Sequence, residues 1–448
     1  MTSIENAAAA EAVTSADSTR PSPTRTGNIV GVAYGLVALA SSAAAVVVPA
    51  IRDDFDVSLA TGAWVITAFI VSLAASAPIY GRIADHIGPR TPVTIGLVIL
   101  SLGAVLSAFA PSIGTLIAAR ALLGLGAGSM PVLAPVIIAL NTSEEERPHV
   151  LTRMSGIVAA SSSGLLIGAL LSEFLGWRPA LALPALGLLL IGPVRKLTTP
   201  STGSLKGVDR FGAAGVALIA VGLNVSLQLF ANVGVGLIGI AILALGIAAS
   251  VLGARRSDQQ FLPPSVLRRS LTWRIPLAGS AIPATYFSLL IIVPAVLTEQ
   301  HGLGRITIGA LLFPSAFIGI IVGPIAARLR NYLSTSQMAA TGLALASVSM
   351  FGTAFLLDHP IGIAIAFAVL AIAFGIGQGA LLGLLSLGTP PDEQGAALAV
   401  FMVVFFLGGG IGGTLLTILG ESLSLGTSLA IMATLPVIGA LSILTLRP

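Results

Sequence analysis

The sequence predicts an all-α membrane protein of fourteen transmembrane helices, arranged as two related six-helix bundles with two further helices inserted between them. Three observations support this fold class. Of the 448 residues, 55% are hydrophobic and only 9% are charged, whereas soluble proteins carry about 25% charged residues. Fourteen apolar runs are each long enough to cross a bilayer. Short patterns in the first half of the chain recur in the same order in the second half.

A helix needs roughly 20 apolar residues to cross the hydrocarbon layer. Runs of this kind lie near residues 28–51, 61–81, 91–110, 113–140, 150–173, 178–194, 211–229, 233–253, 274–297, 306–328, 335–357, 361–386, 394–419 and 426–446. None of them alternates between polar and apolar residues as the strands of a membrane barrel do. The runs therefore predict helices.

The basic residues give these spans an orientation. With a cytoplasmic N-terminus, eighteen Arg and Lys side chains fall inside and three, Arg52, Arg178 and Arg305, fall outside. Arg120 lies within a span. This bias is typical of bacterial inner-membrane proteins, and it places both termini in the cytoplasm. The formal net charge of +4 is too small to indicate nucleic-acid binding.

The recurring patterns divide the chain into halves. Pro78 and Arg82 return as Pro324 and Arg328 at an offset of 246, and Pro49 returns as Pro294 at 245. The resulting prediction is a disordered cytoplasmic tail over 1–26, a six-helix bundle over 27–194, a linker with two extra helices over 195–273, and a second bundle over 274–448. Duplicated halves around a central site are the architecture of secondary transporters.

Residues 81–90 form the predicted loop between the second and third spans. Gly81 and Gly88 would allow tight turns where two helices end. Asp85 would favour a helix N-terminus and could pair with Arg82 or Arg90. The alternative is a solvated basic loop that only fixes topology.

This loop resembles the signature loop of the major facilitator superfamily, and residues 28–446 are similar to its fourteen-span drug:proton antiporter branch. Segments 64–69, 208–212 and 261–264 agree with that branch. The resemblance implies that Asp85 helps to lock the bundles in the outward-open state, supported by Arg82 and Arg90. The second copy, around Arg328, has Asn331 in place of the aspartate, which predicts a weaker lock.

Arg120 is the one unambiguous charge deep within a predicted span. A charge at mid-bilayer costs several kcal/mol unless it faces a cavity or a partner, so Arg120 is predicted to be functional, with a structural hydrogen-bond hub as the alternative. The resemblance implies a role in handling protons or substrate charge. Gly124 and Gly126, on the same span, would allow close helix packing.

Glycines also gather in the fifth and thirteenth spans. They are Gly156, Gly164, Gly168, Gly408 and Gly412. The first three occupy the place of the antiporter branch's Gly-Pro-x-x-Gly-Gly motif, although the proline is missing here. Helix packing and a hinge both remain open as roles.

An embedded acid for proton coupling is hard to find in this sequence. The first-span acid of the branch falls at Ala40. Glu173, near the outer end of the fifth span, is the best proton-carrier candidate, and a plain interfacial acid is the alternative. Proton coupling is therefore implied by the resemblance rather than by the residues.

The substrate pathway is expected near the bilayer midplane, between the bundles. Its candidate lining residues are Tyr34, Ser41, Ser42, Arg120, Ser161, Ser162, Tyr286, Ser288 and Gln378. The serines could instead bond within their own helices. Phe401, Met402, Phe405 and Phe406 would supply an adaptable apolar surface that suits a lipophilic substrate. Asn224 and Gln228, in the extra pair, are expected to lie outside the pathway.

No catalytic set is visible: the chain has no cysteine, no nucleotide-binding Gly-x-x-x-x-Gly-Lys-Ser/Thr motif and no metal-ligand cluster. No enzyme activity, cofactor or metal is expected. The leading hypothesis is a monomeric exporter of small lipophilic compounds that uses protons as the coupling ion and lies in the bilayer. A facilitator or importer of a metabolite is one alternative, and a non-transporting sensor or scaffold is another.

Overall fold

A computed structural model describes residues 21–200, 203–204, 209–227, 233–256, 260–390 and 393–446. All secondary structure in these ranges is helical. Gln228 lies outside them, as does most of the predicted N-terminal tail, and the side chain of Ser162 is not described.

The first group of helices covers the expected N-terminal bundle. It comprises α2 (Pro23–Phe55), α3 (Leu59–Ile87), α4 (Arg90–Ala108), α5 (Ile113–Ala127), α6 (Ser129–Asn141), α7 (Arg147–Ala160), the 3₁₀ turn η1 (Ser161–Ser163), α8 (Gly164–Leu175), α9 (Trp177–Ala182), η2 (Leu183–Leu186) and α10 (Gly187–Lys196).

Two inserted helices and a second group follow. The inserted helices are α11 (Arg210–Ser226) and α12 (Val233–Arg256). The C-terminal group comprises α13 (Pro264–Leu267), α14 (Ser270–Gly279), α15 (Ala281–Glu299), α16 (Arg305–Leu312), α17 (Pro314–Leu329), α18 (Thr335–Phe355), α19 (Pro360–Leu387), α20 (Gln394–Ser422), α21 (Leu425–Met432) and α22 (Thr434–Leu444).

The helices have the length and composition of membrane spans. Thirteen helical stretches in the described ranges are long and apolar enough to cross a bilayer, several of them built from two consecutive helices. The fourteenth expected span corresponds to α11, a shorter apolar helix of 17 residues. The predicted all-α membrane fold is therefore confirmed.

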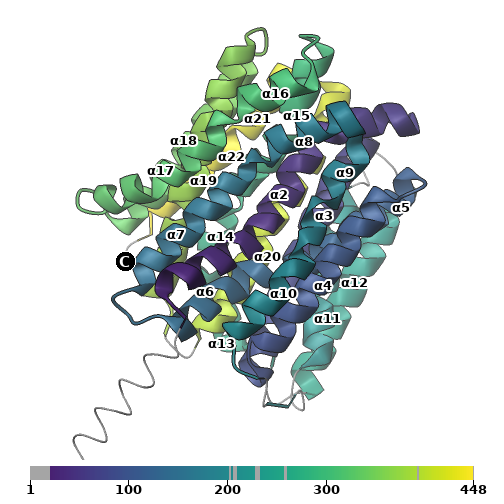
Figure 1. The fold of residues 1–448 in the computed structure, drawn as a ribbon. Helices are drawn as coiled ribbons and strands as arrows, with labels where there is room; N and C mark the ends of the chain where they lie inside the picture. Colours follow the sequence, from purple (N-terminus) through teal and green to yellow (C-terminus); the bar gives the residue numbers. More distant parts are fainter. Residues whose placement is uncertain are drawn as a thin grey trace, which may run out of the picture.

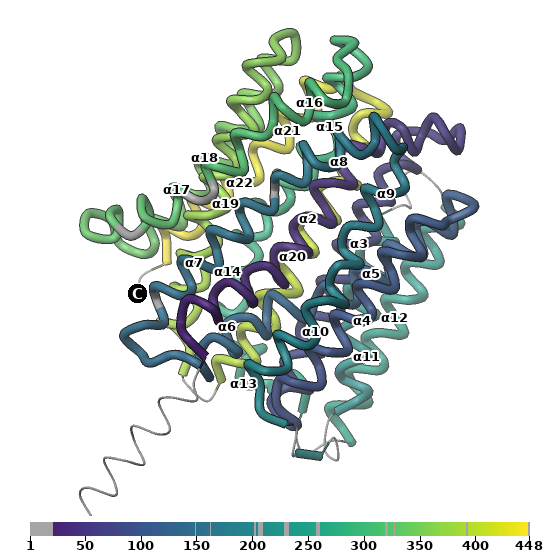
Figure 2. Tube along the Cα trace, viewed as in Figure 1, coloured from purple at the N-terminus to yellow at the C-terminus, as the bar shows by residue number. Residues whose placement is uncertain are grey.

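The helices run back and forth between two faces of the molecule. We call the face at which α2 begins the proximal face and the face at which it ends the distal face. In Figure 1 the purple-to-blue N-terminal group and the green C-terminal helices lie side by side, and Figure 2 shows the same arrangement along the Cα trace. The groups meet where α3 packs on α20, α8 on α16, α7 on α17 and α2 on α15. Of the inserted pair, α11 packs against both α3 and α20, and α12 packs mainly on α11.

Local sequence explains where many helices begin. The hydroxyls of Ser22, Ser58, Ser112, Ser334 and Ser424 accept hydrogen bonds from backbone N–H groups in the first turns of α2, α3, α5, α18 and α21. The repeated prolines occupy related positions, because Pro49 lies within α2 and Pro294 within α15, while Pro78 lies within α3 and Pro324 within α17.

Three boundaries differ from the sequence expectation. Helix α2 begins at Pro23, within the range predicted to be disordered, because Ser22 caps it and proline is favoured in the first turn. Helix α3 continues to Ile87, so Gly81 lies inside a helix rather than at a turn, and Asp85 lies in a last turn rather than at a helix N-terminus. The predicted loop shrinks to Gly88 and Pro89 because the helix extends beyond the apolar run.

The predicted fifth span is interrupted. It consists of α7 and α8, joined by the 3₁₀ turn Ser161–Ser163. At this break the Ser161 hydroxyl donates a 2.9 Å hydrogen bond to the carbonyl of Ile157. Short 3₁₀ segments within long helices often mark hinges. Both roles considered for the glycines of the fifth span, helix packing and a hinge, therefore remain open at this break.

Candidate functional site

Arg120 is fully buried and joins three helices of the N-terminal group. Its Nε donates a 2.9 Å hydrogen bond to the carbonyl of Val65 in α3, and its Nη2 donates a 2.9 Å bond to the carbonyl of Ala40 in α2. The guanidinium also lies 4.9 Å from the centre of the Phe69 ring. Its Nη1 has no hydrogen-bond partner among the described residues. Arg120 thus forms a hydrogen-bond hub with one donor group left over.

The first-span candidates divide by their hydrogen bonding. The hydroxyls of Ser41 and Ser42 donate to the carbonyl of Ala38, at 2.9 and 3.0 Å, so both bond within their own helix. Ser42 also reaches the carbonyl of Ser161 at 3.5 Å. Tyr34 is partly buried on the same helix. The two serine hydroxyls are therefore already engaged, although they lie on the helix that Arg120 contacts.

The C-terminal candidates lie in an aromatic environment. The ring of Tyr286 lies 5.1 Å from that of Phe287, 5.2 Å from that of Phe374 and 6.2 Å from that of Phe367. Gln378 is partly buried on α19, and Ser288 is fully buried with no hydrogen-bond partner among the described residues. The C-terminal group therefore offers aromatic rings and few hydrogen-bonding groups to the expected pathway.

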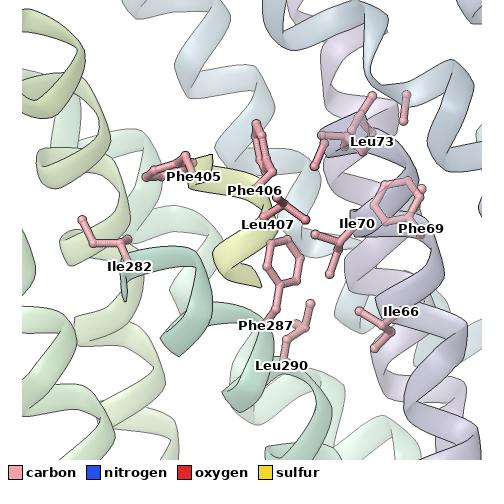
Figure 3. Close-up of a cluster of buried hydrophobic side chains, with 14 of the residues drawn as sticks. Ile66, Phe69, Ile70, Leu73, Ile282, Phe287, Leu290, Phe405, Phe406 and Leu407 are labelled. Carbon is pink, nitrogen blue, oxygen red and sulfur yellow. The ribbon is translucent and has the colours of Figure 1, made fainter. Parts of the chain in front are cut away.

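Apolar side chains fill the seam between α3 and the pair α15 and α20. Figure 3 shows Phe287, Phe406 and Leu407 pointing from the C-terminal helices toward Ile70 and Leu73 of α3. Phe401 stacks on Phe405, the two ring centres being 5.2 Å apart. Phe406 therefore packs toward the neighbouring group, whereas Phe401 and Phe405 pack within the C-terminal group, where the Phe405 ring lies 5.9 Å from that of Phe374 on α19.

Most of the predicted packing glycines lie where helices touch. A methyl group at Gly124 would overlap the carbonyl of Phe69, and one at Gly126 would overlap the backbone of Leu100. On α20, Gly408 lies against the backbone of Ser280 and Gly412 against that of Ala284. On α8, Gly164 meets the Ser42 hydroxyl and Gly168 meets the backbone of Ala43, and Gly156 is partly buried on α7. Apart from Gly156, each of these glycines lies against a neighbouring helix and permits the two helices to pack closely.

Arg82 connects the proximal end of α3 to the segment that precedes the C-terminal group. Its Nη2 donates hydrogen bonds to the carbonyls of Gln260, at 2.7 Å, and Phe261, at 2.9 Å. The guanidinium lies 5.8 Å from the centre of the Phe261 ring. Phe261 is buried, and its N–H donates a 3.1 Å bond to the carboxylate of Asp209, which caps α11. Arg82 thus touches the segment where the inserted pair meets the C-terminal group.

The other predicted gating residues make fewer contacts. Gly88 has φ of 81°, a backbone conformation that favours glycine, and it ends α3. Asp85 and Arg328 are exposed and Arg90 is partly buried, and none of them takes part in an ion pair among the described residues. The ion pair expected for Asp85 is therefore not formed in this conformation.

Two ion pairs join the groups at the distal face. Arg52, at the end of α2, pairs with Glu299, at the end of α15, at 2.5 Å. Arg305, at the start of α16, lies 4.0 Å from Glu173, near the end of α8. We call these two the distal ion pairs. Close to the second one, a methyl group at Gly309 would press on Ala169 of α8. The distal ends of the two groups are thus held together.

Glu173 lies at this distal contact rather than inside the helix packing. Its side chain is 46% exposed. Among the described residues, the one buried carboxylate is that of Asp209, at the proximal start of α11. A buried acid at mid-height is absent from the parts of the chain that the structure describes.

Asn224 occupies an unexpected position. It lies on α11, is fully buried, and faces Gly410 of α20 and Val71 of α3, because a methyl group at Gly410 would meet both side chains. Neither its Nδ2 nor its Oδ1 has a hydrogen-bond partner among the described residues. The inserted helix therefore reaches the seam between the groups, and the expectation that Asn224 lies outside the transport pathway stays a prediction.

Sequence reasoning missed the distal ion pairs and the seam position of Asn224. A signal for the ion pairs was present, because Arg52, Arg178 and Arg305 were the three exceptions to the charge bias. Each of them is paired in the structure, Arg178 with Asp54 at 3.3 Å. No sequence signal distinguished Asn224 from a lipid-facing residue.

Comparison with known proteins gives consistent results. The family model described as Major Facilitator Superfamily matches residues 30–413. The multidrug efflux pump LfrA of Mycolicibacterium smegmatis is 28% identical over 88% of this chain and 81% of its own length. The puromycin resistance protein pur8 of Streptomyces alboniger is 28% identical over 92% and 84% of the two chains, and the cephamycin export protein CmcT of Amycolatopsis lactamdurans is 28% identical over 88% and 84%.

Solved structures share the fold. The human organic anion transporter MFSD10 (TETRAN) superimposes with a TM-score of 0.67 at 16% identity, covering 95% of this chain and all of that one. The xylose transporter XylE from E. coli, in a partially occluded inward-open conformation, gives a TM-score of 0.65 at 14% identity, with 96% and 100% covered.

Proposed function

As this chain belongs to the major facilitator superfamily, we propose that it exports small lipophilic compounds from a bacterial cell by alternating access. It is a multi-pass transmembrane transporter. The observation that carries the direction and substrate class is the similarity along most of its length to LfrA, pur8 and CmcT, whose names describe efflux, resistance and export.

We propose that the proximal face is cytoplasmic and that both termini lie there. The support is the excess of Arg and Lys near the proximal helix ends, such as Arg82, Arg90, Arg195 and Lys196. With this orientation the conformation described here is closed toward the outside by the distal ion pairs. Export then requires these pairs to break while contacts form at the proximal face.

The substrate would bind near mid-height between the two groups. Arg120 contributes one unpartnered Nη1 from the N-terminal group, and Tyr286 with its neighbouring rings contributes an apolar wall from the C-terminal group. Such a site suits a lipophilic molecule with a hydrogen-bond acceptor. In the conformation described here the seam is packed, so the groups must move apart for binding.

Proton coupling is proposed to act through Glu173. Its carboxylate faces Arg305 across the seam and is reachable from the distal side. Protonation of Glu173 would remove this attraction and favour separation of the distal ends, which links proton binding to outward opening. The protein is proposed to work as a monomer, since each chain contains both halves of the pathway.

The decisive experiment combines drug susceptibility with vesicle transport. A deletion strain and an overexpressing strain should differ in resistance to a panel of lipophilic antibiotics, and inverted vesicles should accumulate an affected compound. Dissipating the pH gradient should slow accumulation. An accumulation rate that is the same with and without the pH gradient would instead support a facilitator. The lack of a buried mid-height acid in the described residues favours that alternative. Unchanged resistance in both strains would contradict drug export.

A further inference from the structure

An apolar cavity in the described residues lies outside the seam between the two groups. It has a volume of about 600 Å³ and runs along the proximal half of the molecule, between the inserted helix α11 and the C-terminal helices α14, α20 and α22. Its back wall includes Pro78 of α3. We call it the proximal groove.

The proximal groove opens sideways, toward the bilayer. Leu277 of α14 and Ile438 of α22 line it and are 59% and 61% exposed. The deeper walls are Val216 and Ile219 of α11 and Val400 and Val403 of α20. These side chains are aliphatic, so filling the groove with water would leave that water short of hydrogen-bond partners.

The way α11 packs creates the groove. Near Asn224 the amide side chain of α11 lies against Gly410 of α20, where a methyl group would leave it no room. Toward the proximal face, Val216 of α11 and Val400 of α20 stand on opposite walls of the groove. Leu223, next to Asn224, and Gly412 of α20 also line the cavity, so the groove follows α11 and α20 from the proximal end to the level of Asn224.

The proximal rim of the groove is cationic. Arg274 lines the groove, is exposed, and donates a 2.9 Å hydrogen bond to the Thr445 hydroxyl. Trp273, 39% exposed, lies beside it, as is typical of residues at a membrane interface. The sequence from 255 to 274, which connects α12 to α14, contains five arginines and one aspartate. Arg256 lies over the ring of Phe211 at the start of α11, with its guanidinium carbon 5.6 Å from the ring centre.

We propose that the proximal groove is a binding site for an anionic phospholipid of the adjoining leaflet, with one acyl chain between α11 and α20 and the phosphate beside Arg274. The apolar walls match the chain and the cationic rim matches the headgroup. Lipid is present in the bilayer in large excess over any transported compound, so a lipid occupies an open lateral groove unless a competitor binds much more strongly. This proposal does not depend on the transport function.

Lipid retention tests the proposal directly. The full-length protein is reconstituted into bilayers of phosphatidylcholine and phosphatidylglycerol, extracted gently, and its bound lipids are counted by native mass spectrometry. We expect one phosphatidylglycerol retained in preference to phosphatidylcholine. Arg274→Gln should lower this preference about fivefold, the effect of one basic side chain near an anionic surface. Arg195→Gln, an exposed arginine at the proximal end of α10, is the matched control and should leave it unchanged.

A second variant tests the acyl-chain part of the site. Ala399→Phe places a ring in the groove and should reduce retention of both lipids, because the chain and the ring compete for one space. Ala248→Phe makes the same change on the exposed surface of α12 and should have no effect. Equal retention in these two variants would overturn the proposal.

Labelling of the unmodified protein keeps the test independent of variant folding. A phosphatidylglycerol with a photoreactive acyl chain should label peptides from α11, α20 and α22 in excess of those from α12. Uniform labelling of all lipid-facing helices would contradict a specific site. Displacement of the bound lipid by an equimolar transported drug would show that the groove holds substrate instead, and would equally overturn the proposal.

Discussion

The guanidinium of Arg82 donates a hydrogen bond to the backbone carbonyl of Phe261 and lies 5.8 Å from the centre of its ring, although 179 positions separate the two residues. This contact ties the proximal end of α3 to the segment between the inserted pair and the C-terminal group. Movement of one group against the other must either carry this contact along or break it.

Removing the Arg82 contact should loosen the segment around Phe261. A charged donor bonded to a carbonyl contributes about 1.5–3 kcal/mol, so Arg82→Ala should raise the population of the open segment by a factor on the order of 10 to 100. Trypsin digestion of inverted vesicles should then cut faster at the neighbouring Arg268 and Arg269. Arg195→Ala is the control, and an unchanged cleavage rate in Arg82→Ala would show that the contact does not restrain the segment.

The distal ion pairs should bias the protein toward the conformation described here. Exposed pairs contribute about 0.2–1 kcal/mol, so Glu299→Gln should increase the distally open population by up to about fivefold. Glu173→Gln should have a smaller effect because the Arg305 pair is longer, at 4.0 Å against 2.5 Å. Spin labels on cysteines introduced at the distal helix ends would report this distance change, and the chain has no native cysteine to interfere.

Asp54→Asn provides a strict control for these variants. It breaks a similar exposed pair, with Arg178, which joins α2 to α9 inside the N-terminal group. A distal opening in Asp54→Asn as large as that in Glu299→Gln would mean that charge loss alone, and not the link between groups, causes the shift.

Replacing the unpaired amide of Asn224 should stabilise the fold. A buried polar group without a partner costs about 1–3 kcal/mol, so Asn224→Leu, of similar volume, should raise the thermal unfolding temperature in detergent. Asn141→Leu should lower it, since that amide donates hydrogen bonds to the carbonyls of Ile137, at 2.7 Å, and Leu197, at 2.8 Å. Destabilisation by both variants would indicate that Asn224 has a partner in the membrane.

Arg120 should matter for both stability and transport. Arg120→Ala leaves the carbonyl oxygens of Val65 and Ala40 without these bonds and removes the contact with the Phe69 ring. We expect an apparent loss of about 2–4 kcal/mol in stability and loss of drug accumulation. Arg120→Lys keeps the charge but carries its donors on one nitrogen, which cannot occupy the separate positions from which Nε and Nη2 bond the two carbonyls and Nη1 stays unpartnered. If Arg120→Lys transports normally, the unpartnered Nη1 has no role in substrate binding.

Gly88 should be required for its backbone conformation alone. Its φ of 81° is unfavourable for alanine, while no neighbouring atom would obstruct a methyl group there. With ψ of 165° Gly88 lies in a region that essentially only glycine adopts, so Gly88→Ala should lower the free energy of unfolding, as measured by thermal unfolding, by about 1–3 kcal/mol. Gly114→Ala, also in open space but within α5, should be neutral or stabilising. Equal effects of the two substitutions would contradict this explanation.

Much of the fold could be read from local patterns. The spans were visible because each one needs about 20 apolar residues whatever its neighbours are. The repeated prolines lie within the helices paired by the duplication, as the offset between Pro49 and Pro294 implied. The burial of Arg120 was also expected, because it interrupts an apolar run. The proposed roles of Tyr34, Tyr286 and Gln378 in the pathway stay predictions.

Helix ends and interhelical contacts were harder to predict. The apolar run of the second span stops near Gly81, but α3 continues to Ile87 because a helix satisfies its own backbone hydrogen bonds in water as well as in lipid. The break at Ser161–Ser163 lies where α2 packs on both α7 and α8, a contact that no single-helix pattern contains.

By itself the sequence determined that this protein is an all-helical membrane protein, because hydrophobicity and length act on each helix separately. The twofold relation of its halves stays a prediction. Only the tertiary structure decided that α11 lies on the seam, that Arg52 meets Glu299, and that a groove opens beside Arg274. These features depend on which helix faces lie together. In a uniformly apolar chain, many alternative pairings bury the same kind of surface, so their choice rests on small residues and on a few polar contacts between segments far apart in sequence.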